Sequence, residues 1–315
     1  MMNQIWTVTM NPALDYETSV PVIRSRSKLR CSAPMLNPGG GGINVSRAIR
    51  RIGGHSHAFV ALGGAVGDEV LSLLQAEGIE AEVMDVNGST RISFAVTETD
   101  TAEHFRFILP GPRLTEGEIE DALRRIGELA AGGIVVFSGS QPPGAPDDFL
   151  IRLSARLSNV GARLFADTSG PAMDAILSGK GGPLAVLRLD MAEAAQAAGK
   201  VLKDAGDSAE FGRDLINRGV AEMVIVSRGS EGSVLVDGTQ RLFCRPPKVP
   251  VKSETGAGDS LMGAVTWRLA QGDGVEAALQ AGVAAAAAAV MTEATNLCEG
   301  ADVVRLMPEC RVEAV

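Results

Sequence analysis

The stretch Glu254-Thr255-Gly256-Ala257-Gly258-Asp259-Ser260 is a glycine turn that runs directly into an apolar segment, residues 261–269. Two glycines let the backbone curl so that successive N–H groups converge. The start of a helix adds unpaired N–H groups and the positive end of its dipole. This combination predicts an anion-binding site. Asp259 lies in the middle of it, where its carboxylate either caps the helix or takes a proton from a hydroxyl that attacks a bound phosphate.

A second glycine-rich loop, Pro38-Gly39-Gly40-Gly41-Gly42, also precedes a helical pattern. The apolar residues of that pattern fall on one face of the expected helix: Val45, Ala48, Ile49 and Ile52. Four consecutive glycines cost conformational entropy unless the backbone must approach something closely. A flexible linker does not usually run into an apolar-faced helix, so we favour a ligand-binding loop over a linker.

Strand-like and helical segments alternate along most of the chain. The expected strands are 5–10, 58–62, 134–137, 163–167, 184–188 and 223–227, and the expected helices include 116–130, 146–159, 171–178 and 207–218. Apolar strands separated by helices predict a parallel sheet that is covered on both faces. The pair 233–236 and 240–243 predicts an edge hairpin. The alanine-rich run 281–291 predicts a tightly packed interior helix.

Two regions interrupt this alternation. The runs 91–96 and 104–109 are strand-like with no helix between them, which predicts a hairpin. Together with residues 16–33, which include the β-prone run 29–33, they suggest a small separate sheet. We therefore expect one domain, 1–315, with a lid built from segments 13–33 and 88–109. Because isolated small sheets are marginally stable, we expect the lid to pack against another subunit.

Composition narrows the classes of function. The chain has 315 residues and a formal net charge of −9. It is long enough for a large core, and it lacks the basic excess typical of proteins that bind nucleic acid or membrane surfaces. Its four cysteines lack metal-ligand spacing, which favours free thiols. His55 and His57 have no partners at useful spacing, which argues against a metal hydrolase. Without a targeting signal or a membrane span, we expect a cytoplasmic protein.

Asp15 follows the first expected strand, in Asn11-Pro12-Ala13-Leu14-Asp15. Open α/β sheets bind ligands beyond the carboxyl ends of their strands, so Asp15 is a candidate for holding substrate hydroxyls. The alternative is an ordinary turn aspartate. A dinucleotide-binding dehydrogenase is disfavoured, because its Gly-x-Gly-x-x-Gly turn would stand at this place.

Taken together, these pieces resemble the ribokinase-like superfamily of sugar kinases, and within it the phosphofructokinase B family. The N-terminal signature runs from Gly40-Gly41-Gly42-Ile43-Asn44 through Gly53 and Gly63, and the C-terminal signature is Gly256-Ala257-Gly258-Asp259. The resemblance covers essentially the whole chain. It implies a three-layer α/β/α fold with a mostly parallel central sheet and a small β-sheet lid, and a homodimer.

Within the family, the chain is most similar to the minor bacterial 6-phosphofructokinases. Gly41 stands where 1-phosphofructokinases and tagatose-6-phosphate kinases usually carry a lysine, and Lys28-Leu29-Arg30-Cys31 indicates the same subfamily. The resemblance implies ATP-dependent phosphoryl transfer to a hydroxyl of a ketohexose phosphate. The first expectation is conversion of fructose 6-phosphate to fructose 1,6-bisphosphate.

The resemblance also implies roles for individual residues. Asp259 would be the general base, and Gly256, Ala257 and Gly258 would form the anion hole. The substrate would be bound by Asp15, Lys28, Arg30, Gly40, Gly41, Asn44, Arg91 and Ser140. Of these, Lys28, Arg30 and Arg91 would hold its phosphate, with Arg106 as a further candidate.

The nucleotide half of the site departs from the family pattern. Ser227, Gly229 and Gly232 match the loop that receives the nucleotide phosphates. However, Arg188-Leu189-Asp190 replaces the usual Lys-Pro-Asn, Glu254 replaces a threonine and Ala294 replaces a glycine. Arg188 would still supply a cation, and Asp190 and Glu193 would hold Mg²⁺ through water. The implied cofactors are ATP and Mg²⁺, with a monovalent cation such as K⁺ as a third.

Alternative functions remain open at this stage. A tagatose-6-phosphate kinase or a 1-phosphofructokinase would share the same site, and whether a second ATP inhibits the enzyme is open as well. A different class is a sugar-phosphate-binding protein with impaired catalysis, since the departures fall on the nucleotide half. The intact turn Gly256–Asp259 argues against that class. Lys28, Arg30 and Arg91 disfavour a nucleoside or free-sugar kinase.

Overall fold

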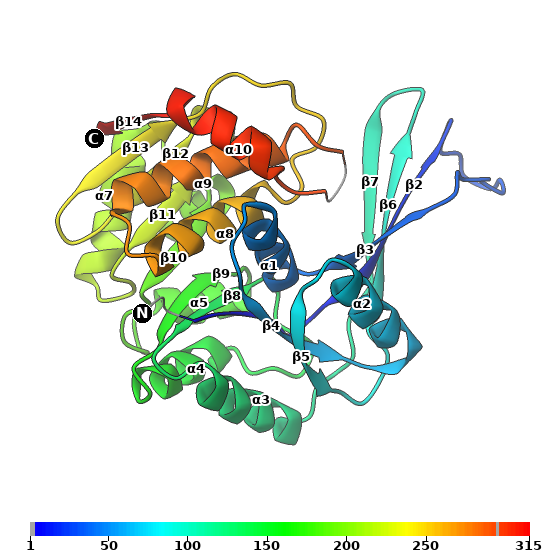
Figure 1. Ribbon diagram of the computed structural model, residues 1–315, viewed down its shortest axis with the longest axis horizontal. Coiled ribbons are helices and arrows are strands. Elements are labelled where there is room, and N and C mark those ends of the chain that lie inside the picture. Colours follow the sequence, from blue (N-terminus) through cyan, green and yellow to red (C-terminus); the bar gives the residue numbers. More distant parts are fainter. Residues whose placement is uncertain (1–3, 294–295) are drawn as a thin grey trace.

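A ten-stranded sheet with helices on both faces forms the body of the protein in the computed structural model, which describes residues 4–293 and 296–315 (Figure 1). Seven neighbouring strands are parallel: β5 (Glu80–Asp85), β4 (His57–Leu62), β1 (Ile5–Thr9), β8 (Ile134–Ser138), β9 (Arg163–Asp167), β10 (Val186–Asp190) and β11 (Val224–Ser227). The antiparallel strands β12 (Ser233–Val236), β13 (Arg241–Arg245) and β14 (Arg311–Ala314) complete one edge.

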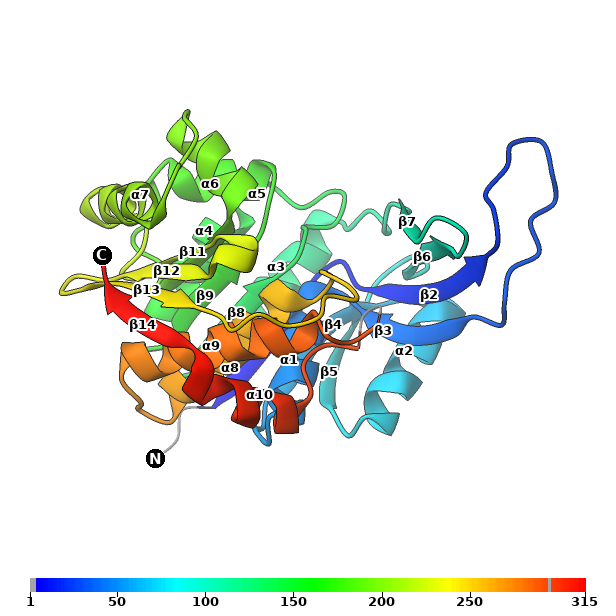
Figure 2. The same cartoon turned by 90° about the horizontal axis from the view of Figure 1, so that it is seen from above.

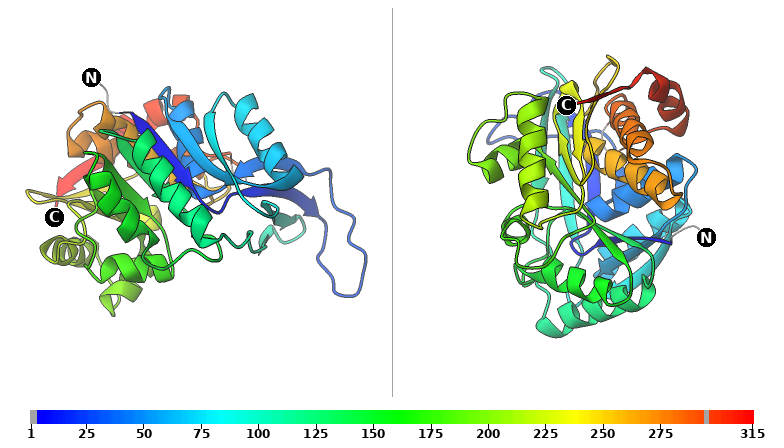
Figure 3. Two further views of the ribbon diagram at one scale, coloured as in Figure 1. Left: turned by 90° about the horizontal axis from the view of Figure 1, so that it is seen from below. Right: turned by 90° about the vertical axis from the view of Figure 1, so that its left-hand side faces the viewer.

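The helices form the two outer layers (Figure 3). One face carries α3 (Glu116–Leu129), α4 (Phe149–Ser158), α5 (Pro171–Leu177), α6 (Met191–Ala198) and α7 (Ala205–Asn217). The other carries α1 (Gly41–Arg51), α2 (Gly64–Ala76), α8 (Ala257–Ala270), α9 (Val275–Ala289) and α10 (Gly300–Leu306), followed by the 3-10 turn η2 (Met307–Glu309). The predicted three-layer α/β/α architecture is therefore confirmed.

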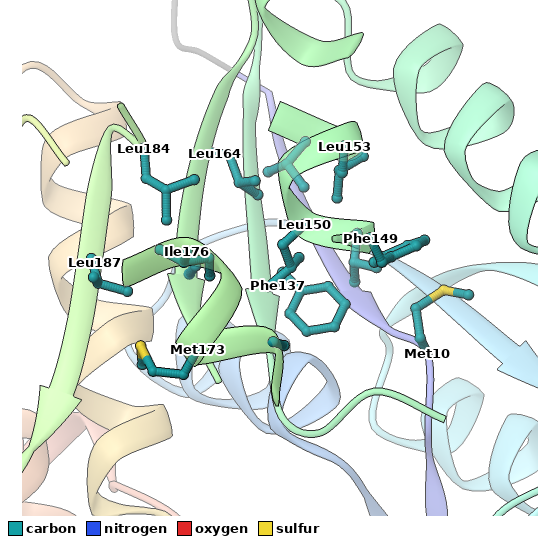
Figure 4. Close-up of a cluster of buried hydrophobic side chains, with 14 of the residues drawn as sticks. Met10, Phe137, Phe149, Leu150, Leu153, Leu164, Met173, Ile176, Leu184 and Leu187 are labelled. Atoms are coloured by element: carbon teal, nitrogen blue, oxygen red, sulfur yellow. The ribbon is translucent and has the colours of Figure 1, made fainter. Parts of the chain in front are cut away.

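The strands are apolar throughout because both of their faces are covered. In β8, Val135 and Phe137 belong to the core under α3–α7, whereas Ile134 and Val136 belong to the core under α1, α8 and α9. Figure 4 shows Phe137 packed among the side chains of α4 and α5. At about 25 cal/mol per Å² of apolar surface, burial on both faces of these strands makes a large contribution to stability.

The alanine-rich run forms α9, as predicted, and packs against α8. Ten of its residues are buried. A Cβ on Gly282 would lie 2.6 Å from Val265 Cγ2, so small residues permit the close approach of the two helices. Gly263 likewise permits the close approach of α8 to α1. A Cβ on Gly263 would lie 2.9 Å from the Cβ of Ala48 and 3.1 Å from the carbonyl oxygen of Val45.

A small four-stranded sheet stands beside the body, in the order β3-β2-β6-β7. Its strands are β2 (Ala13–Val20), β3 (Met35–Gly39), β6 (Arg91–Glu98) and β7 (Glu103–Ile108). The expected β6–β7 hairpin is present, and β2 runs parallel to β6. The expectation of β-structure at 29–33 is wrong: residues 21–34 form a loop that projects well beyond the body (Figure 2), and the fourth strand is 35–39 instead. Bonds at the base of the loop, such as Ser32 N–H to the carbonyl of Ser19 at 2.9 Å, do not continue into a ladder.

One further expectation about the main sheet is wrong, and two elements of the body were not predicted. The β12–β13 hairpin is not at the edge, because β14 returns from the C-terminal segment and pairs with β13. Strand β5 forms the opposite edge, although its sequence alternates weakly. Helix α6 was not expected, and it begins with a capping box formed by Asp190 and Glu193.

The strand order indicates where a ligand would bind. From the central pair β1 and β8, the chain proceeds to β4 and β5 on one side and to β9, β10 and β11 on the other. Loops that leave the carboxyl ends of β1 and β8 therefore diverge, and open sheets bind ligands in the crevice that results. Within the described residues, no helix has the length and apolar character needed to span a membrane.

Candidate active site

The predicted anion turn forms the N-terminus of α8. Gly256 caps the helix with φ +79°, and a Cβ there would lie 2.5 Å from Leu297 Cδ2, so both the conformation and the space require glycine. The first amide to donate within the helix is that of Ser260, to the carbonyl of Gly256 at 2.9 Å. The N–H groups of Ala257, Gly258 and Asp259 thus have no acceptor within the helix. They are available to an anion at the positive end of the helix dipole.

The Asp259 carboxylate is held by two side chains from other elements. Asn44 Nδ2, on α1, donates to Oδ2 at 3.0 Å, and Ser138 Oγ, at the end of β8, donates to Oδ1 at 3.1 Å. Burial and, after it, the negative charge of Asp167 raise the pKa of Asp259 to about 6, although both hydrogen bonds and Arg188 oppose this. A carboxylate fixed in this way, with a pKa near neutrality, suits a general base better than a helix cap.

Ser138 is a candidate site residue that sequence reasoning did not single out. A Cβ on Gly41 would meet Ser138 Oγ and would lie 2.7 Å from the backbone nitrogen of Gly139. The second glycine loop therefore packs directly against the end of β8, and this contact brings Asn44 to Asp259. In the sequence, Ser138 directly follows the expected strand 134–137 and begins the run Ser138-Gly139-Ser140.

Asp15 lies on the small sheet with two arginines nearby. It is paired with Asn37 of β3 and Ser93 of β6 across the strands, and a Cβ on Gly39 would lie 2.7 Å from its Oδ1. Burial raises the pKa of Asp15 to about 6, against the opposing charges of Arg106 and Arg91 and a hydrogen bond with Ser93. The structure thus brings Asp15, Arg91 and Arg106 together, as a substrate that carries both hydroxyls and a phosphate would require.

Arg91 joins the small sheet to the end of β1. Its Nη2 donates to the carbonyl of Asn11 at 3.0 Å and its Nη1 to that of Leu109 at 3.3 Å. Burial lowers the pKa of Arg91, while Asp15 opposes the shift. Asn11 in turn donates to Ser140 Oγ at 3.1 Å, which places Ser140 at the same crevice.

Lys28 and Arg30 are not brought to this cluster within one chain. Both are exposed on the projecting loop 21–34 (Figure 2). Their predicted phosphate contacts therefore remain predictions.

Arg188 lies beneath the anion turn. Its Nη1 is 3.2 Å from Asp167 Oδ1, and its Nε donates to Ser227 Oγ at 3.1 Å. A Cβ on Gly258 would lie 2.9 Å from Nη1, so the guanidinium packs against the glycine turn itself. Burial lowers the pKa of Arg188, but Asp167 and the acidic pair on α6 outweigh it, and the net shift is upward. Asp167, which sequence reasoning did not single out, positions this cation.

Asp190 and Glu193 cap helix α6 reciprocally. Glu193 N–H donates to Asp190 Oδ1 at 2.8 Å, and Asp190 N–H donates to Glu193 Oε2 at 2.8 Å. Aspartate is as good an N-cap as the asparagine that the family usually has here. Each carboxylate keeps a second oxygen, which fits Mg²⁺ held through water. Burial and the charge of Asp190 raise the pKa of Glu193, although its bond to the Asp190 amide opposes this.

The predicted nucleotide loop follows β11. It contains the 3-10 turn η1 (Gly229–Glu231), in which Gly229 has φ +58° and Gly232 has φ +127°. A Cβ on Gly232 would collide with the carbonyl oxygen of Cys244. Both glycines are thus needed by the backbone, whether or not a nucleotide binds. Leu189 is buried and Glu254 is exposed, and Ala294 lies outside the described residues.

A buried carboxylate at a helix N-terminus, with Asp15, Arg91 and Arg106 gathered near the end of β1, is an arrangement that suits a carbohydrate kinase. The sequence profile of the pfkB family carbohydrate kinases matches residues 5–301, and the chain belongs to this family. It is 36% identical to the ATP-dependent 6-phosphofructokinase isozyme 2 of Escherichia coli K12, over 96% of this chain and 97% of that one. It is 39% identical to the isozyme 2 of Mycobacterium tuberculosis, over 96% of this chain and 88% of the relative.

The solved structures agree with this assignment. Phosphofructokinase-2 from Escherichia coli in complex with fructose-6-phosphate superposes with a TM-score of 0.91 at 35% identity, covering 98% of this chain and 99% of that one. Other structures of that protein are described as a complex with potassium and as a tetrameric inhibited form. The predicted membership of the phosphofructokinase B family is confirmed.

Proposed function

We propose that this protein transfers the terminal phosphoryl group of ATP to fructose 6-phosphate and forms fructose 1,6-bisphosphate in the cytoplasm. The observation that carries the proposal is the geometry of Asp259. Its carboxylate has a pKa of about 6, is aimed by Asn44 and Ser138, and adjoins the unpaired amides of the α8 N-terminus. A base and an anion site in one helical turn serve the attacking hydroxyl and the transferred phosphoryl group together.

In this mechanism Asp259 takes the proton from the attacking hydroxyl. The amides of Ala257 and Gly258, with the Arg188 cation packed against them, stabilise charge on the transferring group. Asp15, Asn44, Ser140 and the backbone of Gly40 and Gly41 orient the sugar, and Arg91 binds its phosphate with Lys28 and Arg30 from the loop. Bound Mg²⁺ would neutralise phosphate charge, held through water by Asp190 and Glu193, and K⁺ is proposed as a further ion.

Turnover of a substrate panel tests the function: fructose 6-phosphate, tagatose 6-phosphate, fructose 1-phosphate, fructose and ribose, with ATP and Mg²⁺. We expect the highest kcat/KM with fructose 6-phosphate. A preference for tagatose 6-phosphate or fructose 1-phosphate would assign the corresponding kinase instead. Binding of phosphosugars without turnover would favour the binding-protein alternative. Turnover of the unphosphorylated sugars alone would contradict the proposal.

Arg91 provides the prediction for the sugar-phosphate half. Replacing Arg91 with Ala should raise the KM for fructose 6-phosphate by about 10- to 100-fold, because a hydrogen-bonded charge is worth about 1.5–3 kcal/mol. The KM for ATP should change less than about threefold. Initial rates with each substrate varied in turn measure both constants. Arg91→Lys, which keeps the charge, should show an intermediate KM. A larger effect on ATP would mean that the two halves of the site are reversed.

We further propose that the small sheet is a lid that closes over the sugar and mediates a homodimer. Tyr16, Phe94 and Phe107 lie in register on one face, and Tyr16 packs on the core under α2. Beyond α2 the same face leaves Phe94 38% and Phe107 53% exposed. An aromatic face of this kind, on a sheet too small to be stable alone, suits contact with a second copy.

The dimer proposal predicts that a charged substitution on the aromatic face separates the two subunits. Phe107→Asp should shift the protein from dimer to monomer, because a desolvated carboxylate in an apolar interface is costly. Analytical ultracentrifugation measures the change. Val304→Asp is the matched control, since Val304 is exposed to 75% on the body, and it should leave the mass unchanged. A Phe107→Asp protein that stays dimeric would place the interface elsewhere.

A further inference from the structure

Three residues with metal-binding side chains meet at the end of the main sheet opposite the active site. His57 begins β4 and Glu80 begins β5, and the parallel register pairs them directly. His55 lies two residues before His57 in the chain. The catalytic crevice lies at the carboxyl ends of the strands, about 15–20 Å away at 3.3 Å per residue. The two histidines have no partner at useful sequence spacing, but strand pairing supplies Glu80 as a partner in space.

The geometry of this cluster is compact. Glu80 Oε1 is 3.2 Å from His55 Nε2, and Glu80 Oε2 is 3.1 Å from His57 Nδ1. The two imidazole rings are T-shaped to each other, with centroids 4.9 Å apart. One ligand atom from each of the three residues lies within 4.8 Å of the others. In a tetrahedral zinc site with bonds of about 2.0–2.1 Å, ligand atoms are separated by about 3.3 Å.

His57 is also held in place from behind. Its ring stacks on that of Trp6 in β1, at 4.8 Å between centroids and 25° between planes. Its side chain is 23% exposed, whereas His55 and Glu80 are 56% and 63% exposed. The cluster therefore has one side chain fixed on the sheet, His57, and a side that is open to solvent.

We propose that His55, His57 and Glu80 bind a late first-row divalent metal ion, with Zn²⁺ as the representative ion. Two imidazole nitrogens and one carboxylate form a ligand set that suits Zn²⁺, Ni²⁺ and Cu²⁺, whereas Mg²⁺ and Ca²⁺ prefer oxygen ligands alone. The ion joins β4 to β5 at the exposed edge of the sheet. The site is separate from the Mg²⁺ proposed beside α6 and takes no part in phosphoryl transfer.

Calorimetric titration of the metal-free, untagged protein with Zn²⁺ tests the site. Cys31 is an exposed thiol, so the titration uses a Cys31→Ser background to remove a competing ligand. We expect one Zn²⁺ per chain, and at least tenfold weaker binding in His57→Ala. The chain has three histidines, so His104→Ala, on the small sheet, is a matched control and should bind Zn²⁺ as tightly as the parent.

Two further measurements separate this site from incidental binding. Saturating Zn²⁺ should raise Tm by about 4 °C in the parent and in His104→Ala but not in His57→Ala. Cu²⁺ should quench the fluorescence of Trp6 through the stacked His57, and Trp6→Phe should remove that signal while leaving Trp267. Equal Zn²⁺ binding by the parent and His57→Ala, or an equal loss in His104→Ala, would overturn the proposal. These outcomes are independent of kinase activity, so the proposed function can fail without affecting them.

Discussion

Replacing Asp259 with Asn is expected to lower kcat by about 10³-fold while leaving the binding of fructose 6-phosphate nearly unchanged. Asparagine keeps the shape of the side chain and can still accept from Asn44 Nδ2, while the Ser138 hydroxyl turns to accept from the new amide nitrogen. It cannot accept the proton of the attacking hydroxyl. Steady-state rates and calorimetric titration of the phosphosugar measure the two quantities. Turnover close to that of the parent protein would remove Asp259 from the role of general base.

The thermal stability of Asp259→Asn shows whether a loss of activity is caused by unfolding. The folded-state pKa of Asp259, about 6, lies above the ordinary value of 3.8. The folded protein therefore binds a proton more tightly than the unfolded chain, and this group costs stability as pH rises from about 4 to about 6. Asp259→Asn removes that cost, so its Tm at pH 7 should equal or exceed that of the parent. A lower Tm would mean that lost packing, rather than lost proton transfer, explains the inactive protein.

The second large effect is expected at the Arg188–Asp167 pair. Arg188→Met should lower kcat by about 10²-fold, because it removes a cation beside the anion turn. It should also destabilise the protein by about 3–5 kcal/mol, because Asp167 is left buried without a partner. The Arg188 charge lowers the pKa of Asp259 and the Asp167 charge raises it. The acid limb of the kcat/KM profile, which falls below about pH 6 in the parent, should therefore move to higher pH in Arg188→Met.

Asp167→Asn is the opposing variant. Removing its negative charge should move the same acid limb to lower pH, since burial then acts on Asp259 without that added charge. Arg188→Lys restores the cation usual in the family and should keep the limb within a few tenths of a pH unit of the parent. A purely structural role for the pair predicts lower rates with no movement of the limb. Limbs that move in the same direction in Arg188→Met and Asp167→Asn would contradict the electrostatic account.

Much of the fold could be predicted from local patterns. The alternation of apolar strands with helices fixes a parallel sheet covered on both faces, and both glycine turns lie at helix starts, as expected. The elements that were missed depend on distant partners. Strand β14 forms only because the C-terminal segment returns to β13, and β5 has the weak alternation of an edge strand. The β-prone run 29–33 meets β2 through Ser32, but no ladder of hydrogen bonds follows, so its propensity does not produce a strand.

The candidate site shows the same division. Asp259 and the turn Gly256–Gly258 were predictable because a glycine turn and a helix start are local signals. Ser138 and Asp167 were missed because each is a polar residue at a strand end, and only the sheet order shows which strand ends meet at α8. Asp190 illustrates a third case: it departs from the family pattern, but it caps helix α6 as well as the usual asparagine would, while adding a negative charge beside Glu193.

The contact between α1 and α8 at Gly263 has a consequence for tolerance to mutation. One helix carries Asn44 and the other carries Asp259, and at Gly263 the two backbones approach as closely as the absence of a side chain allows. Even alanine there would push the helices apart and lengthen the 3.0 Å bond that aims the base. Gly263 touches no substrate, but the geometry of the catalytic site requires glycine at this position. Active enzymes should therefore tolerate few substitutions at Gly263, because both folding and activity depend on the contact between α1 and α8.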